Sequence, residues 1–210
     1  MDSIPLLDAK RQTLRALWRD KMHVEPQALE RSPVAVRASY AHIWEPAEVW
    51  MQALEVLPLG LLCLWGDCSH GHLVFTAQAS EYRPGAQIWQ GKTLESVCYL
   101  SLADLRQNSR HAMWATLALV DHLLGSQAQP DGLWFSDGQG VTPHLRAAAA
   151  RFVALHVLGY GAEELKAATA RDYFAHALEL YLTLPQRLNV LAPQMYRLCR
   201  HELMNEVWWS

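Results

Sequence analysis

The sequence predicts an α+β fold dominated by helices, with a small mixed sheet. Runs that resemble strands are confined to residues 60–100, whereas the chain from residue 109 onward shows the spacing of apolar residues that is typical of helices. Between residues 112 and 120 only one residue is polar, and apolar side chains occupy every face, which indicates a buried central helix over about 110–124. We therefore expect a small mixed sheet, this buried central helix and several C-terminal helices.

The first hundred residues begin with helices and continue with strands. A helix is expected over about 5–21, because leucines and a tryptophan recur on one side of it, and Pro46 suits the first turn of another helix. Two apolar runs, 60–65 and 72–76, are joined by the turn sequence GDCSHG, which predicts a β-hairpin. Further strands are expected over 86–89 and 97–100.

Capping residues mark the helices of the second half. Ser101 with Asp104 resembles a capping box that opens a short helical turn. Ser109 is the expected N-cap of the helix that ends near residue 124, and Thr142 before a proline predicts a helix that continues to about residue 158. Two more helices are expected, over about 163–182 and from Pro193 onward.

Composition limits the classes of protein to which the chain can belong. Its 210 residues are 51% hydrophobic and 19% charged, which is enough apolar material to bury a core. No linker or repeat divides the chain, so we expect one domain over 1–210, with an N-terminal helical part (1–58) and a main part (59–210). The formal net charge of −3 argues against a nucleic-acid partner.

Neither a secretory signal nor a membrane span is expected. The N-terminus lacks the basic and apolar regions of a signal, and the longest apolar run, 57–65, is far shorter than the ~20 residues that cross a bilayer. We therefore expect a cytoplasmic protein of bacterial type with no membrane partner. Its cysteines are expected to be reduced thiols.

Two acid–histidine pairs are candidates for chemistry. Asp121 and His122 end the central helix, but neighbouring residues lie ~100° apart on a helix and cannot jointly face one ligand. A histidine there also gains from the helix dipole without any further role. Asp172 and His176 are spaced i,i+4, with Glu179 following, so they share one stripe. That stripe is either a solvated helix face or a set of groups aimed at His122.

Three stretches carry a resemblance to a known family. They are LALVDHLLGS (117–126), LWFSDGQGVTPHL (133–145) and ARDYFAHALELYLTLPQRLNVLAPQMYRL (170–198). Together they resemble the zincin metallopeptidases related to the catalytic domain of anthrax lethal factor, over residues from about 95 to 205. The resemblance implies a zincin-like fold and a cleft that binds peptide.

The resemblance also implies that the catalytic residues are lost. The family binds zinc through a His-Glu-x-x-His helix, in which the Glu is the general base, and through a downstream Glu. His122 stands at the second histidine, whereas Ala118 and Leu119 occupy the positions of the first histidine and the base. His176 stands where the downstream Glu is expected. Leucine accepts no proton from a metal-bound water, so the usual hydrolysis is excluded.

The favoured function is therefore that of a catalytically degenerate zincin-like protein. It would need no cofactor and would bind a peptide or protein, or act as a structural or regulatory subunit. The cleft and partner-binding residues would be Ser136, Asp137, Tyr173, Trp208 and Trp209, and the terminal tryptophans suit an oligomer contact.

Two alternatives stay open. One is a metal-dependent hydrolase of peptidase type, in which His122 and His176 hold zinc with a third group from Asp121, Asp137 or Asp172. The other is an unrelated helical interaction protein. A strand that runs antiparallel along the cleft beside the central helix would argue against this last alternative, and residues 97–100 are the expected strand.

Two further motifs carry less weight. Cys68, His70 and His72 alternate along the chain and could share one face of a strand with Cys63 nearby, but their spacing matches no usual zinc pattern. They are expected to be polar residues of the hairpin turn. The glycine-rich loop 136–140 precedes a helix but lacks the Lys-Ser/Thr of a P-loop, so it is expected to be a turn.

Overall fold

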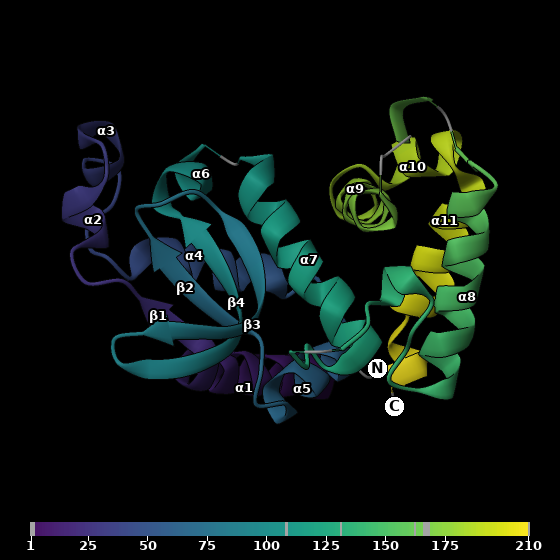
Figure 1. Cartoon of the computed structure of the whole chain (residues 1–210), viewed down its shortest axis with the longest axis horizontal. Coiled ribbons are helices and arrows are strands. Elements are labelled where there is room, and N and C mark those ends of the chain that lie inside the picture. Colours follow the sequence, from purple (N-terminus) through teal and green to yellow (C-terminus); the bar gives the residue numbers. More distant parts are fainter. Residues whose placement is uncertain (1–2, 108, 131, 162, 166–168, 210) are drawn as a thin grey trace.

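The computed structural model describes residues 3–107, 109–130, 132–161, 163–165 and 169–209. Its four strands form one mixed sheet in the order β1-β2-β4-β3 (Figure 1). The strands β1, β2 and β4 run parallel to one another, and β3 pairs antiparallel with β4. Their bounds are Met22–Val24 (β1), His72–Thr76 (β2), Glu81–Trp89 (β3) and Lys92–Ser101 (β4).

Helices account for most of the rest of the described chain, so the helix-rich α+β class with a small mixed sheet is confirmed. In the first half they are α1 (Ser3–Lys21), α2 (Ala28–Arg31), α3 (Val34–Arg37), α4 (Glu45–Leu54), α5 (Leu59–Asp67) and α6 (Leu102–Arg106). In the second half they are α7 (Arg110–Ser126), α8 (Pro143–Val157), α9 (Ala170–Thr183), α10 (Pro185–Leu191) and α11 (Pro193–Leu198). None of the described helices is long and apolar enough to cross a bilayer.

The central position of α7 is confirmed. It stands between the sheet and the C-terminal helices α8 to α11 (Figure 1). Ser109 caps it by accepting a hydrogen bond from the backbone N–H of His111. Most of its residues are buried, because one side packs on β4 and β3 and another side packs on α9.

The expected β-hairpin is wrong in its first strand. Residues 59–67 form α5, and only His72–Thr76 is a strand. A short apolar run does not distinguish a strand from a buried helix, and this one is rich in leucine, which favours helices, without a β-branched residue. The helix also receives a distant cap, because the Glu206 carboxylate accepts a hydrogen bond from the Leu59 N–H at 2.9 Å.

Other boundaries also differ from the sequence predictions. The N-terminal part, expected to be helical, also supplies strand β1. The helix expected over 163–182 begins at Ala170, where Thr169 accepts a hydrogen bond from the Asp172 N–H, and a short 3-10 turn covers Glu163–Leu165. Residues 166–168 of that prediction lie outside the described residues. The helix from Pro193 continues as a π-helical turn over Cys199–Leu203, and α10 was not expected.

The C-terminal segment folds back onto the first helices. Glu206 forms a salt bridge with Lys10 of α1 at 2.7 Å, besides capping α5. Trp209 lies against Gly60 so closely that a Cβ atom at residue 60 would be 2.1 Å from the Trp209 Cβ. Because any side chain at residue 60 would collide with the tryptophan, glycine is required there while Trp209 keeps its place.

This contact predicts that the cost of one mutation is smaller in the presence of another. Gly60→Ala alone is expected to lower the free energy of unfolding by about 1–3 kcal/mol, because the new methyl group overpacks against Trp209. In a Trp209→Gly background the Cβ and ring atoms of residue 209 are absent and its backbone oxygen at 2.9 Å stays, so the cost of Gly60→Ala is expected to fall to less than about 1 kcal/mol. Urea denaturation of the four proteins measures both values. An equal cost in both backgrounds would contradict the packing.

Candidate functional site

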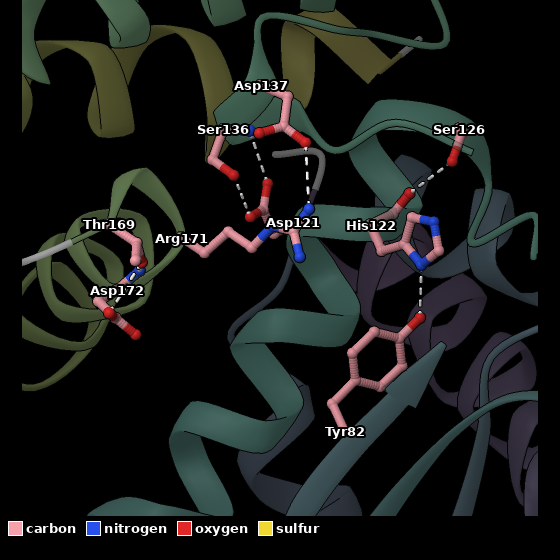
Figure 2. Close-up of polar contacts among 9 residues, drawn as sticks. All are labelled: Tyr82, Asp121, His122, Ser126, Ser136, Asp137, Thr169, Arg171 and Asp172. Atoms are coloured by element: carbon pink, nitrogen blue, oxygen red, sulfur yellow. Dashed lines mark hydrogen bonds and ion pairs between the residues drawn. The ribbon is translucent and has the colours of Figure 1, made fainter. Parts of the chain in front are cut away.

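Two adjacent side chains in the last turns of α7 form the centre of the site (Figure 2). Asp121 and His122 are 1% and 0% exposed. Because neighbours on a helix diverge by ~100°, the two side chains leave α7 in different directions. Asp121 points to the short turn Phe135–Asp137, and His122 points to strand β3.

The imidazole of His122 is enclosed by two aromatic side chains. Its Nδ1 lies 2.7 Å from the hydroxyl of Tyr82 on β3. Its ring stacks on Trp134, with centroids 4.6 Å apart and planes only 7° from parallel. The guanidinium of Arg171 lies 3.9 Å from the Trp134 ring centroid. The histidine is therefore held between the edge strand of the sheet and a tryptophan that an arginine of α9 contacts.

This environment disfavours the charged form of His122. Burial lowers its pKa to about 4, and the positive charge of Arg171 acts in the same direction, whereas the backbone of Gly132 and Gln129 opposes both effects. The Nε2 atom is buried and has no hydrogen-bond partner among the described residues. The ring is accordingly neutral at pH 7, and burial raises the pKa of Tyr82, so that both partners stay uncharged.

Asp121 joins α7 to the short turn Phe135–Asp137. It accepts hydrogen bonds from the backbone N–H and the hydroxyl of Ser136, at 2.8 and 2.6 Å. Burial raises the pKa of the Asp121 carboxyl to about 7, although these hydrogen bonds pull in the opposite direction. Ser136, expected in a cleft that binds a partner, is itself 1% exposed and is used by this contact.

The two positions that lack zincin residues differ in their surroundings. Leu119, at the position of the general base, is completely buried in the core. It packs against Gly71, where an added Cβ atom would meet the Leu119 Cδ1 atom at 3.2 Å. Ala118 is only partly buried. Leu119 is thus part of the hydrophobic core.

The described ring contacts place His176 near a different part of α7 from His122. His176 lies against Trp114, with ring centroids 6.1 Å apart. Trp114 precedes His122 by about two turns, roughly 12 Å along the helix axis. Among the described residues no group of three or more His, Cys, Asp or Glu side chains could hold a metal ion. The proposed zinc set of His122, His176 and an aspartate therefore has no geometric support.

The acids of the predicted stripe have local partners. Asp172 shares a capping interaction with Thr169, whose hydroxyl donates to its carboxylate at 2.8 Å. Glu179 accepts hydrogen bonds from the Arg110 side chain and from the Trp114 indole, which fastens α9 to α7. In Figure 2 the Asp172 side chain lies beside Thr169, on the other side of Arg171 from Asp121 and His122.

The remaining predicted residues are distributed over separate places. Tyr173 was expected to contact a partner but is 3% exposed, and its hydroxyl donates to the carbonyl of Tyr160 at 2.7 Å. Asp137 is exposed and forms an ion pair with Arg171 at 3.3 Å. Trp208 is half-exposed and stacks on His144, whereas Trp209 packs on Gly60. These residues do not form one surface around His122.

The residues expected to form a peptide-binding strand beside the central helix do not lie at an edge of the sheet. Residues 97–100 belong to β4, which is an interior strand between β2 and β3. The antiparallel strand at the edge is β3, and its Tyr82 contacts His122. The polar residues of the expected hairpin turn lie instead between α5 and β2, where Lys21 donates hydrogen bonds to the carbonyls of Cys68 and His70.

Comparison with known proteins finds no relative: no family model, no curated protein and no solved structure matches the chain. The resemblance to zincins stays a prediction from the sequence.

Three residues that complete the site were not predicted from the sequence: Tyr82, Trp134 and Arg171. Trp134 and Arg171 lie within the stretches that resemble zincins, and this position was a signal that could have marked them as site residues. Tyr82 lies on a strand whose early part was not recognised, and its contact with His122 depends on the pairing of β3 with β4.

The hydrogen bond from Tyr82 to His122 is expected to contribute to stability. Tyr82→Phe leaves the buried Nδ1 atom without a partner, so the free energy of unfolding should fall by about 1–3 kcal/mol. Tyr99→Phe on the neighbouring strand is the matched control, because no described residue hydrogen-bonds its hydroxyl, and its cost should stay below about 0.5 kcal/mol. Chemical denaturation measures both, and equal costs would contradict the assigned role.

Asp121 is expected to make stability depend on pH. Because its pKa is raised to about 7, the folded protein holds a proton that an unfolded chain, with a carboxyl pKa of ~3.9, releases above that pH. The resulting stabilisation is fully present below the unfolded pKa and is lost as the pH rises to the folded pKa of about 7.

Asp121→Asn removes this titration while it keeps the shape of the side chain. The free energy of unfolding of the natural protein minus that of the variant is expected to fall by about 2–3 kcal/mol between pH 5 and pH 8. Urea denaturation at several pH values gives this difference, and a difference that does not change with pH would refute the raised pKa.

Proposed function

We propose that the chain is a zincin-like protein without catalytic activity, which binds an extended peptide by pairing it with strand β3. The observation that carries the proposal is that β3 is an antiparallel edge strand beside α7, while the histidine that faces it is occupied by contacts within the fold. Edge strands accept peptides through backbone hydrogen bonds, and pockets for alternate side chains give specificity.

The outer edge of β3 is suited to pairing in its second half. Within the described sheet β3 pairs only with β4, so its other edge keeps unpaired backbone groups. Its first half is interrupted by Pro84 and by a register shift between Arg83 and Ala86. From Ala86 to Trp89 the pairing is regular, and Ile88 is 77% exposed. An incoming peptide would therefore pair with residues 86–89.

The environment of His122 supports binding without hydrolysis. A zincin needs an exposed imidazole nitrogen, a metal and a general base, whereas here Tyr82 and Trp134 enclose the imidazole and Leu119 occupies the position of the base. The same residues that resemble a peptidase helix would then serve to anchor the edge strand on α7. The peptide would be held and released intact.

Selection from a displayed library of random ten-residue peptides tests the proposal. The selected peptides should bind the natural protein, and Ile88→Lys should weaken them by about tenfold or more, because a charge on an edge strand opposes strand pairing. Val190→Lys is the matched control: it places the same charge at another exposed apolar residue, 80% exposed on α10, and should leave affinity unchanged.

Three outcomes would overturn the proposal. They are selection of no peptide, equal affinity for the natural protein and the Ile88→Lys variant, and cleavage of a bound peptide. Mass spectrometry of the peptide after incubation with the protein detects cleavage directly.

A further inference from the structure

A second feature lies on the other side of α7 from His122. It is a cavity of about 630 Å³ between α4, the corner where α6 meets α7, and the C-terminal half of α9. A smaller cavity of about 350 Å³ shares four of its lining residues, among them Trp50 and Met113. Volumes of this size are typical of sites for small molecules. We call the two together the α4–α7 cavity.

The walls of the α4–α7 cavity are mostly apolar. In the larger part, Pro46, Val49, Trp50 and Ala53 of α4 face Leu105 of α6 and Met113 of α7. The smaller part is mostly apolar, with Leu54, Val56, Leu57, Leu117, Val120 and Leu182 in its wall beside Gln52, Thr116 and Thr183. An occupant must therefore have a substantial apolar portion.

The carboxylates at the cavity have partners within the fold. Glu179 accepts hydrogen bonds from Arg110 and Trp114, at 2.7 and 2.8 Å. Asp104 accepts a hydrogen bond from the backbone N–H of Ser80 at 3.3 Å. Both carboxylates are thus held by donors of the fold, and both keep their negative charge.

Two donors, in contrast, have no partner in the described part of the chain. The Arg106 guanidinium lines the cavity and takes part in none of the described ion pairs or side-chain hydrogen bonds. The indole N–H of Trp50 is buried and has no acceptor. The N-terminal turn of α7 also lines the cavity with Arg110 and Ala112, and the positive end of the helix dipole favours an anion there.

We propose that the α4–α7 cavity binds an amphipathic monocarboxylate, such as a medium-chain fatty acid. Its carboxylate would pair with Arg106 near the start of α7. Its alkyl chain would lie along Trp50 and Met113 and enter the smaller, apolar part. A cationic head group of the same length would meet Arg106 and the positive end of α7, so it is disfavoured. The proposal is independent of peptide binding at β3.

Isothermal titration calorimetry with sodium octanoate, kept below its micelle concentration, tests this site. Octanoate is expected to bind with one site per chain, and octyltrimethylammonium and acetate should bind about tenfold more weakly or not at all. The first comparison isolates the charge of the head group, and the second isolates the alkyl chain.

Two variants place the site on the structure. Arg106→Ala should weaken octanoate by about tenfold, whereas Arg197→Ala, which removes an exposed arginine of α11, should leave it unchanged. Ala53→Trp adds a large side chain at an exposed position that lines both parts of the cavity, so it should abolish binding while the circular dichroism spectrum stays that of a folded protein.

Several results would overturn the proposal. Octanoate that shows no saturable binding, equal binding of the cationic analogue, or full affinity in the Arg106→Ala variant would each do so. Retained binding in a folded Ala53→Trp protein would place the ligand elsewhere.

Discussion

Two neighbouring residues near the end of α7 hold the sheet and the C-terminal half of the chain in place. The His122 imidazole is hydrogen-bonded to the Tyr82 hydroxyl on the edge strand, and it stacks on the ring of Trp134 in the loop after α7. Asp121 binds both the backbone and the side chain of Ser136. Since both side chains are buried, each missing partner would leave a polar group without a hydrogen bond, which is costly in an interior. These contacts join α7 to the edge strand and to the turn Phe135–Asp137.

The same contacts explain why the resemblance to a metallopeptidase need not carry its chemistry. In the arrangement found here the pKa of His122 is lowered to about 4. The ring is covered by Trp134 and is 0% exposed. His176 lies against Trp114, about two turns away along α7. The described part of the structure thus combines an edge strand with one unpaired edge and a histidine that is part of the packing.

The sequence predicted the regular elements better than it predicted the contacts between them. The caps Ser109 and Thr142 act locally, so the helices that they begin were placed correctly. The run 60–65 was assigned to a strand because local spacing contains no information about the distant cap from Glu206. The site was predicted only in part. His122 and Asp121 were named, but Tyr82 approaches through strand register, which is set by tertiary structure.

Histidine-selective NMR distinguishes a neutral, enclosed His122 from a His122 that binds metal. A titration of the natural protein, with the His122→Gln variant to assign the resonance, would be recorded without zinc and with one equivalent of zinc. We predict that His122 stays neutral until the pH approaches about 4 and that zinc at pH 7 leaves its resonance unchanged. Titration at the ordinary value of ~6.5, or a zinc-dependent shift that the variant lacks, would contradict the enclosed, neutral state.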